Sequence, residues 1–165
     1  MEVAIIMGSD SDWPRLEAAW ELLRGFGIEA GVRILSAHRS PEDCVRFVQQ
    51  AEGAGVQVFI AAAGLAAHLP GVVAAHTQRP VIGLPLAAGP LQGQDALYSV
   101  VQMPPGVPVA TVGIDNARNA ALLAAEILAL GDRRLADKLK AYRQDLRRQV
   151  LARDGQLQEE LEARA

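Results

Sequence analysis

Five short runs of aliphatic residues alternate along this chain with segments of helical periodicity, and no other feature limits the possible fold as strongly. The runs are rich in Val, Ile and Ala and show little alternation with polar residues, which is typical of parallel strands buried on both faces of a sheet. They cover residues 2–7, 31–35, 56–62, 80–84 and 109–112. Helical spacing of apolar residues fills the intervals, over residues 13–25, 41–53, 69–76, 95–101 and 116–129. This alternation through short connections predicts a three-layer α/β/α sandwich around a parallel sheet, with right-handed crossovers.

Residues 131–165 differ from the rest of the chain, being rich in Arg, Gln, Glu and Leu. Their apolar residues are spaced by four and three positions, which marks one stripe of a helix: Leu135, Leu139, Tyr142, Leu146 and Val150. The stripe can cover the chain's own domain or a neighbouring subunit, and the sequence leaves both open. Gly155 is expected to weaken or end the helix. We therefore expect one α/β domain over residues 1–130 and a C-terminal helical extension of the same domain over residues 131–165.

Composition narrows the choice of partner and compartment. The formal net charge of −3 gives no reason to expect a nucleic acid partner. Only two lysines exist, Lys138 and Lys140, and both lie in the C-terminal segment. The single cysteine, Cys44, rules out a disulfide within the chain and fits a reducing compartment. Because the chain shows no signal peptide and no apolar run that could span a membrane, we expect a cytoplasmic protein without a membrane partner.

The segment Ser36-Ala37-His38-Arg39-Ser40-Pro41 places an imidazole beside a guanidinium where a strand gives way to a helix. Ser40 is predicted to cap this helix, with Pro41 as its first residue and Asp43 at the third position of a shortened capping box. Free backbone N–H groups at a helix start attract anions, and imidazole titrates near neutral pH. The segment therefore predicts a site for an anionic substrate that exchanges a proton.

A second segment, Gly8-Ser9-Asp10-Ser11-Asp12-Trp13, follows the first strand and opens a helix. The hydroxyls of Ser9 and Ser11, together with backbone N–H groups, can hold a phosphate. Asp12 would repel phosphate but can accept hydrogen bonds from ribose hydroxyls. It can equally be only a helix cap, and the sequence leaves the two roles open. A magnesium-dependent phosphotransferase built on Asp10 and Asp12 is disfavoured, because the body of the domain has no lysine to help hold a phosphate.

Small residues dominate the segment 61–67 after the third strand, where a planar ring could lie against the backbone. His68 follows at the turn into a helix, a setting in which histidine is more often a structural cap than a catalyst. His76 is interpreted as structural, and Cys44, inside a predicted helix, as a small buried apolar residue. The sequence offers no set of residues at metal-ligand spacing, so we expect no metal cofactor.

Six segments occur together in an order that resembles one known family. They are residues 8–13, 36–41, 66–71, 99–104, 106–111 and 119–124. From residue 2 to about residue 130 the chain resembles the N5-carboxyaminoimidazole ribonucleotide mutases, the catalytic subunits of bacterial phosphoribosylaminoimidazole carboxylase in de novo purine synthesis.

This resemblance implies a flavodoxin-like fold assembled as a homo-octamer, with sites at subunit contacts. It implies a reaction that moves a carboxylate from the exocyclic N5 nitrogen of an aminoimidazole ribonucleotide to ring carbon C4, without ATP, metal or organic cofactor. In that reaction His38 would move the proton, Arg39 and residues 9–11 would hold the ribose phosphate, and Asp12 would bind the ribose hydroxyls. The implied substrate-binding set is Ser9, Ser11, Asp12, Ser36, Arg39, Gly64 and His68.

Two residues depart from the family pattern. Many relatives have glycine where Ala62 and Leu65 stand, so we expect a narrower pocket. A second class of the family carboxylates aminoimidazole ribonucleotide with free CO2, but Trp13 and segment 66–71 resemble the mutase class. A flavodoxin-like module that only binds a nucleotide is the non-enzymatic alternative. A histidine beside an anion-binding arginine argues against it, because simple binding needs no titrating group.

Overall fold

The computed structural model describes residues 1–164, in which strands and helices alternate. The strands are β1 (Val3–Met7), β2 (Ala30–Ile34), β3 (Val58–Gly64), β4 (Val81–Leu86) and β5 (Ala110–Thr111). The helices are η1 (Asp10–Asp12, a 3-10 turn), α1 (Trp13–Phe26), α2 (Pro41–Gly53), α3 (Leu69–Ala75), α4 (Gln94–Val101), α5 (Ala117–Ala129) and α6 (Arg133–Glu162). All strand pairs are parallel, in the order β2-β1-β3-β4-β5. The predicted parallel sheet is confirmed.

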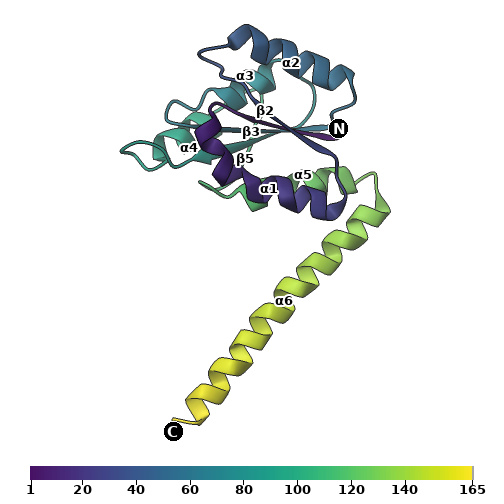
Figure 1. The fold of residues 1–165 in the computed structure, drawn as a ribbon, viewed down its shortest axis with the longest axis vertical. Helices are drawn as coiled ribbons and strands as arrows, with labels where there is room; N and C mark the ends of the chain where they lie inside the picture. Colours follow the sequence, from purple (N-terminus) through teal and green to yellow (C-terminus); the bar gives the residue numbers. More distant parts are fainter. Residues whose placement is uncertain (165) are drawn as a thin grey trace. The chain divides into compact units, whose positions relative to one another are not determined.

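Helices cover both faces of this sheet and complete the three layers. α2 and α3 lie on one face, and α1 and α5 lie on the other (Figure 1). The face under α2, α3 and α4 holds a core that includes Val48, Phe59, Val73 and Val100, all fully buried. Complete burial of such a side chain contributes about 1.5–3 kcal/mol. Mostly aliphatic packing therefore holds these helices on the sheet.

Two strands differ from the prediction. β2 is partly exposed rather than buried on both faces, because it forms one edge of the sheet. β4 continues beyond Leu84 through Pro85 to Leu86. Pro85 pairs with Ala63 near the end of the β3–β4 register, where the loss of one backbone donor is tolerated more easily than in the middle of a strand.

The start of α2 also differs from the prediction in one detail. The helix begins at Pro41, as expected, but Ser40 makes no side-chain capping hydrogen bond. The Ser40 hydroxyl instead accepts a hydrogen bond from the N–H of Ser36 over 3.1 Å and donates to the Ser36 carbonyl over 3.2 Å. Asp43 pairs with Arg46 on the same helix at 3.0 Å. The capping box predicted at this helix is therefore wrong, because both of its side chains have other partners.

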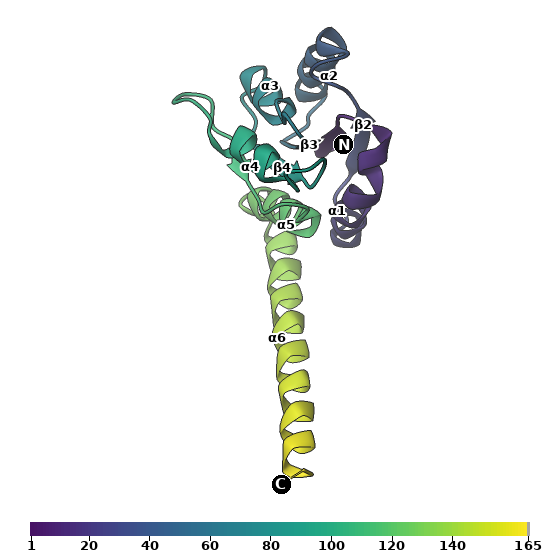
Figure 2. The same cartoon turned by 90° about the vertical axis from the view of Figure 1, so that its left-hand side faces the viewer.

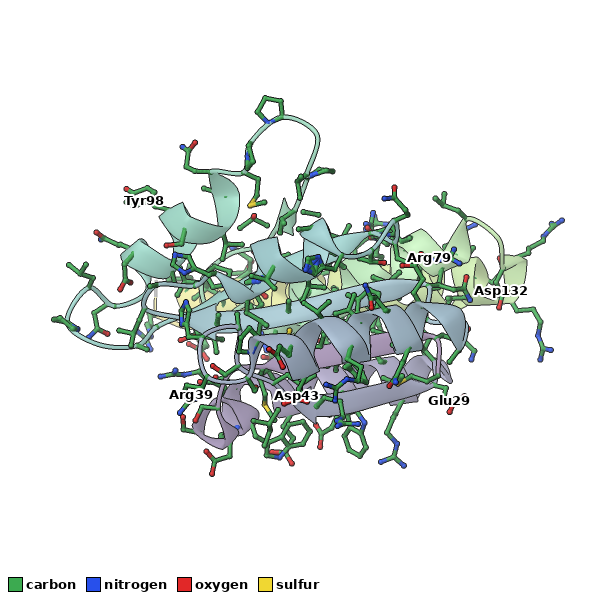
Figure 3. The ribbon with its side chains drawn as sticks, turned by 90° about the horizontal axis from the view of Figure 1, so that it is seen from above. Glu29, Arg39, Asp43, Arg79, Tyr98 and Asp132 are labelled. Carbon is green, nitrogen blue, oxygen red and sulfur yellow. The ribbon has the colours of Figure 1, made fainter. Side chains whose placement is uncertain are left out.

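The parallel strands bring their carboxyl ends to one edge of the sheet. Figure 3 shows Arg39, which follows β2, at the opposite end of the sheet from Glu29, which precedes β2. β2 and β3 lie on either side of β1, so the chain winds away from β1 in both directions. A crevice at such a switch in strand order is the usual ligand site of an open parallel sheet.

The chain from Ala129 onward forms a second compact unit that consists mainly of α6. Asp132 caps α6, its carboxylate accepting hydrogen bonds from the N–H groups of Arg134 at 2.8 Å and Leu135 at 3.2 Å. The helix continues through Gly155 to Glu162 (Figure 2), so the expectation that Gly155 ends it is wrong, and the alternative, that Gly155 weakens it, stays a prediction. A glycine in a helix costs only about 1 kcal/mol, which the surrounding good helix formers offset. None of the helices in residues 1–164 has the length and apolar character needed to cross a membrane.

Candidate active site

A cavity of about 520 Å³ opens where the loops after β1, β2 and β3 converge. All the residues that the sequence analysis selected as site residues line it: Ser9, Ser11, Asp12, Ser36, His38, Arg39, Gly64 and His68. The carboxyl-end rule for parallel sheets explains why residues so far apart in sequence meet here. Ala88, after β4, also lines the cavity. The sequence analysis did not name this residue, although the same rule points to the segment after β4.

Two imidazole rings meet in this cavity. Nε2 of His38 lies 2.8 Å from Nδ1 of His68, and the two rings are nearly perpendicular, with an angle of 86° and centroids 4.9 Å apart. One of these nitrogens must carry a proton and donate while the other accepts. His68 stands at the cap position of α3 without making a side-chain capping bond. Its ring therefore orients His38 rather than capping the helix.

Arg39 connects two of the loops around the cavity. Its Nη2 donates a hydrogen bond to the Gly8 carbonyl over 2.7 Å, and its Nε donates to the Ser36 hydroxyl over 3.4 Å. The Ser36 hydroxyl also accepts from the backbone N–H of Arg39 at 3.1 Å. A guanidinium carries five N–H donors, so these contacts leave further donors for an anion. Arg39 thus has a structural contact in addition to the binding role predicted for it.

A capping box holds the loop between β1 and α1. Ser9 caps η1 by accepting a hydrogen bond from the Ser11 N–H over 3.4 Å, and Asp12 Oδ2 accepts from the Ser9 N–H over 3.2 Å. The Ser11 hydroxyl donates to the Ser9 hydroxyl at 2.9 Å. This reciprocal pattern is the one that the sequence analysis had placed at α2. The Asp12 side chain makes no capping hydrogen bond to α1. One of its oxygens takes part in the capping box of η1, and the other can still accept a hydrogen bond from a ligand.

Burial raises the pKa of Asp12 above its ordinary value. Desolvation of the carboxylate is the largest cause. The hydrogen bond from Ser9 and the positive charge of Arg15 act in the opposite direction, as does the more weakly felt charge of Arg39. Ionised Asp12 is therefore less well solvated in the folded protein than in the unfolded chain, and its charge lowers the free energy of unfolding.

We expect Asp12→Asn to raise the thermal unfolding midpoint at pH 7. Folded Asp12 keeps its proton to a higher pH than the unfolded chain does, so stability falls as the pH rises from the ordinary pKa of 3.8 through the raised pKa, and stays lower above it. Asn removes the charge but keeps an acceptor for the Ser9 N–H. The advantage of the variant should shrink below pH 3.8, where the parent residue is neutral in both states. An Asn variant less stable than the parent at pH 7 would contradict this account.

The end of β3 forms one wall of the cavity. Gly64 is required there because a Cβ would lie 2.7 Å from Cβ of Ala88. Ala62 is fully buried within β3 and does not line the cavity, so the expectation that it narrows the pocket is wrong. Leu65 does line it, with its side chain 51% exposed and a backbone φ of 56°. A residue with a side chain adopts this left-handed conformation at a cost of about 1–2 kcal/mol.

The remaining candidates from the sequence lie outside this cavity. Cys44 is fully buried, and burial raises the pKa of its thiol, which confirms its interpretation as a small apolar core residue. His76 ends α3 and is exposed away from the cavity lining. Within residues 1–164, no group of three His, Cys, Asp or Glu side chains is arranged to hold a metal ion.

Comparison with known proteins gives one consistent result. The model of a family described as AIR carboxylase matches residues 2–149. A Saccharolobus solfataricus protein named N5-carboxyaminoimidazole ribonucleotide mutase is 52% identical over 92% of this chain and 96% of its own length. A Thermotoga maritima protein of the same name is 50% identical over 95% of this chain and 92% of its own. The crystal structure of Treponema denticola PurE aligns with a TM-score of 0.86 at 35% identity, over 94% of this chain and 97% of that one.

Proposed function

The chain belongs to the AIR carboxylase family, and we propose that it is an isomerase, an N5-carboxyaminoimidazole ribonucleotide mutase of de novo purine biosynthesis. Its product would be 4-carboxy-5-aminoimidazole ribonucleotide. The observation that carries the proposal is the identity of about half of all positions, over nearly the whole chain, with relatives that bear this name. The cavity supports it, because an imidazole pair, a guanidinium and a hydroxyl-rich loop line the same space.

The reaction exchanges the positions of one carboxylate and one proton. The bond between N5 and the carboxylate carbon breaks and releases CO2, and N5 takes up a proton to give a nucleophilic aminoimidazole. Carbon C4 then attacks CO2, and the ring regains its aromaticity when the C4 proton leaves to a base. One proton is consumed and one is released. A single acid–base group that returns to its starting state can therefore serve both steps.

We assign this group to His38, whose ring is exposed within the cavity. His68 determines which His38 nitrogen carries a proton, because it is held 2.8 Å from Nε2 of His38. When His38 loses its Nε2 proton, the hydrogen bond can reverse and Nδ1 of His68 can donate. His68 thereby keeps its predicted place in the substrate site and also orients the acid–base group.

Binding of the ribonucleotide falls to the loops on either side of His38. Arg39 would supply a positive charge for the phosphate, and the hydroxyls of Ser9 and Ser11 would supply neutral hydrogen-bond donors. Asp12 would accept hydrogen bonds from the ribose hydroxyls through the oxygen that the capping box does not use. The other predicted residues, Ser36 and Gly64, complete the walls of the site.

Retention of CO2 requires a cavity closed to water. In the single chain both His38 and His68 are exposed, so the chain alone does not supply this closure. We propose that a neighbouring subunit of a cytoplasmic homo-octamer covers the cavity. The exposed side chain of Leu65 at the cavity wall is placed to meet it. The left-handed backbone of Leu65 is strain of the kind that collects at functional sites.

The test is turnover by the purified chain without ATP. We expect the N5-carboxylated ribonucleotide to be converted to the C4-carboxylated product, measured by absorbance and mass spectrometry. Labelled carboxylate should pass from N5 to C4 with little exchange with bicarbonate in solution, because the cavity would retain CO2. No product from this substrate, with or without added bicarbonate, would overturn the assignment.

One other reaction has support from the comparisons, because the matching family model is described as AIR carboxylase. A carboxylase of this kind would use aminoimidazole ribonucleotide and free CO2. It would form product from these two and would not convert the N5-carboxylated substrate faster than that substrate decarboxylates spontaneously. The same assay with both substrates therefore separates the two reactions. A module that only binds nucleotide would show affinity without turnover of either.

A further inference from the structure

Six apolar residues of α6 follow a regular pattern along the helix. They form pairs four residues apart, each pair recurring after eleven residues: Leu135 with Leu139, Leu146 with Val150, and Leu157 with Leu161. An eleven-residue repeat corresponds to 3.67 residues per turn, close to an undistorted α-helix, and keeps one stripe facing one direction. The stripe thus extends beyond Val150, through the part of α6 that follows Gly155.

The second and third pairs of this stripe are open to solvent. Leu146 is 43% exposed, Val150 65%, Leu157 52% and Leu161 50%. These four residues lie on one side of the helix and form an apolar surface; the other large exposed apolar residue of this half, Leu151, lies off the stripe. A stripe of this kind on a long helix is typical of a surface that packs against another helix.

The spacing of these four residues is the same in both directions along the helix. From Leu146 the steps are four, seven and four residues, so the pattern is symmetric about the point between Arg153 and Asp154. An antiparallel copy of the same helix, centred at that point, places Leu146 at the level of Leu161 and Val150 at the level of Leu157. The surface is therefore self-complementary, as a two-fold contact between identical chains requires.

Charge on α6 changes sign at the same point. Residues 142–153 contain Arg143, Arg147, Arg148, Arg153 and Asp145, a net charge of +3. Residues 154–162 contain Asp154, Glu159, Glu160 and Glu162, a net charge of −4. The acidic residues of the last turn are unfavourable to the helix by itself, because the macrodipole prefers basic residues near the C-terminus. A parallel pair would place like charges together, whereas an antiparallel pair places the basic half beside the acidic half.

We propose that α6 pairs in antiparallel fashion with α6 of a second copy of this chain, around a two-fold axis between Arg153 and Asp154. Arg147 then lies at the level of Glu160 of the second copy, and Arg153 at the level of its Asp154. The apolar stripe supplies the contact, and the division of charge selects the antiparallel direction. The proposal concerns assembly and does not depend on the reaction assigned to the cavity.

Cysteine cross-linking of the full-length chain tests the direction of this pairing. In an antiparallel pair Arg153→Cys lies beside its own copy and should form an intermolecular disulfide under mild oxidation. Leu146→Cys should not, since fifteen residues of helix, about 22 Å, separate it from its copy. A mixture of Leu146→Cys and Leu161→Cys chains should form a mixed disulfide. The native Cys44 is fully buried and does not compete.

A matched pair of substitutions tests the surface itself. In the Arg153→Cys chain, Leu157→Asp should reduce cross-linking at least tenfold. Leu151→Asp should reduce it much less, because Leu151 is equally exposed, at 55%, but lies off the stripe. Circular dichroism should show the same helix content in both variants.

Self-cross-linking of Leu146→Cys as efficient as that of Arg153→Cys would mean a parallel pair. Failure of Arg153→Cys to cross-link would mean that α6 packs on its own subunit or on the body of another. Either result would overturn the proposal.

Discussion

His38→Asn should lower the turnover number by about 10²- to 10⁴-fold, the usual contribution of a general acid–base group, and leave affinity for the nucleotide within several-fold of the parent. The substituted side chain keeps a polar amide where the imidazole has Nδ1, but it is too short to replace Nε2, which contacts Nδ1 of His68 at 2.8 Å. It cannot give and accept a proton near neutral pH. Steady-state product formation gives the first quantity, and calorimetric titration with the product nucleotide gives the second.

His76→Asn is the matched control, because His76 is exposed but does not line the cavity. This variant should retain the activity of the parent. His68→Asn should lie between the two and should alter the pH dependence of turnover, since it removes the ring that orients His38. If His38→Asn lowered turnover less than about tenfold, another group would have to move the proton, and His38 would be left with a binding role.

The sequence predicted the elements of this fold because the residues that mark their ends act locally. α2 begins at Pro41 and ends at Gly53 as predicted, since proline and glycine constrain the backbone wherever they occur. The prediction failed where a side chain had a choice of partners. Ser40 had the right position to cap α2, but its hydroxyl bonds to the backbone of Ser36. Such a choice depends on the path of the loop, which local sequence does not determine.

The sequence predicted which residues line the cavity, but it did not predict which of them contact one another. The carboxyl ends of parallel strands meet at one edge of a sheet, and the predicted residues do line one cavity there. The contact between His38 and His68 depends on strand order, because the loops after β2 and β3 meet only when both strands flank β1. Parallel strands of similar composition carry little information about their order. The contact of Arg39 with the Gly8 carbonyl depends on the same arrangement.

Arg39→Lys should raise the Michaelis constant about tenfold, since hydrogen bonds to charged groups contribute about 1.5–3 kcal/mol and lysine retains the charge but loses the planar pair of donors. The turnover number should fall much less. A phosphate remote from the reacting ring is bound equally in the ground state and the transition state, so its loss affects substrate binding more than the chemical step. Initial rates over a range of substrate concentrations give both constants.

The contact between Arg39 and Gly8 makes a control necessary, because a loosened loop would also weaken binding. The dephosphorylated nucleoside supplies this control. If Arg39 binds the phosphate, parent and variant should differ with the ribonucleotide and be nearly equal with the nucleoside. A misplaced loop would affect both substrates by the same factor and would also lower the thermal unfolding midpoint. Equal factors would therefore assign Arg39 to holding the loops after β1 and β2 together, and the phosphate would then have to rely on the hydroxyls and backbone N–H groups of residues 9–11.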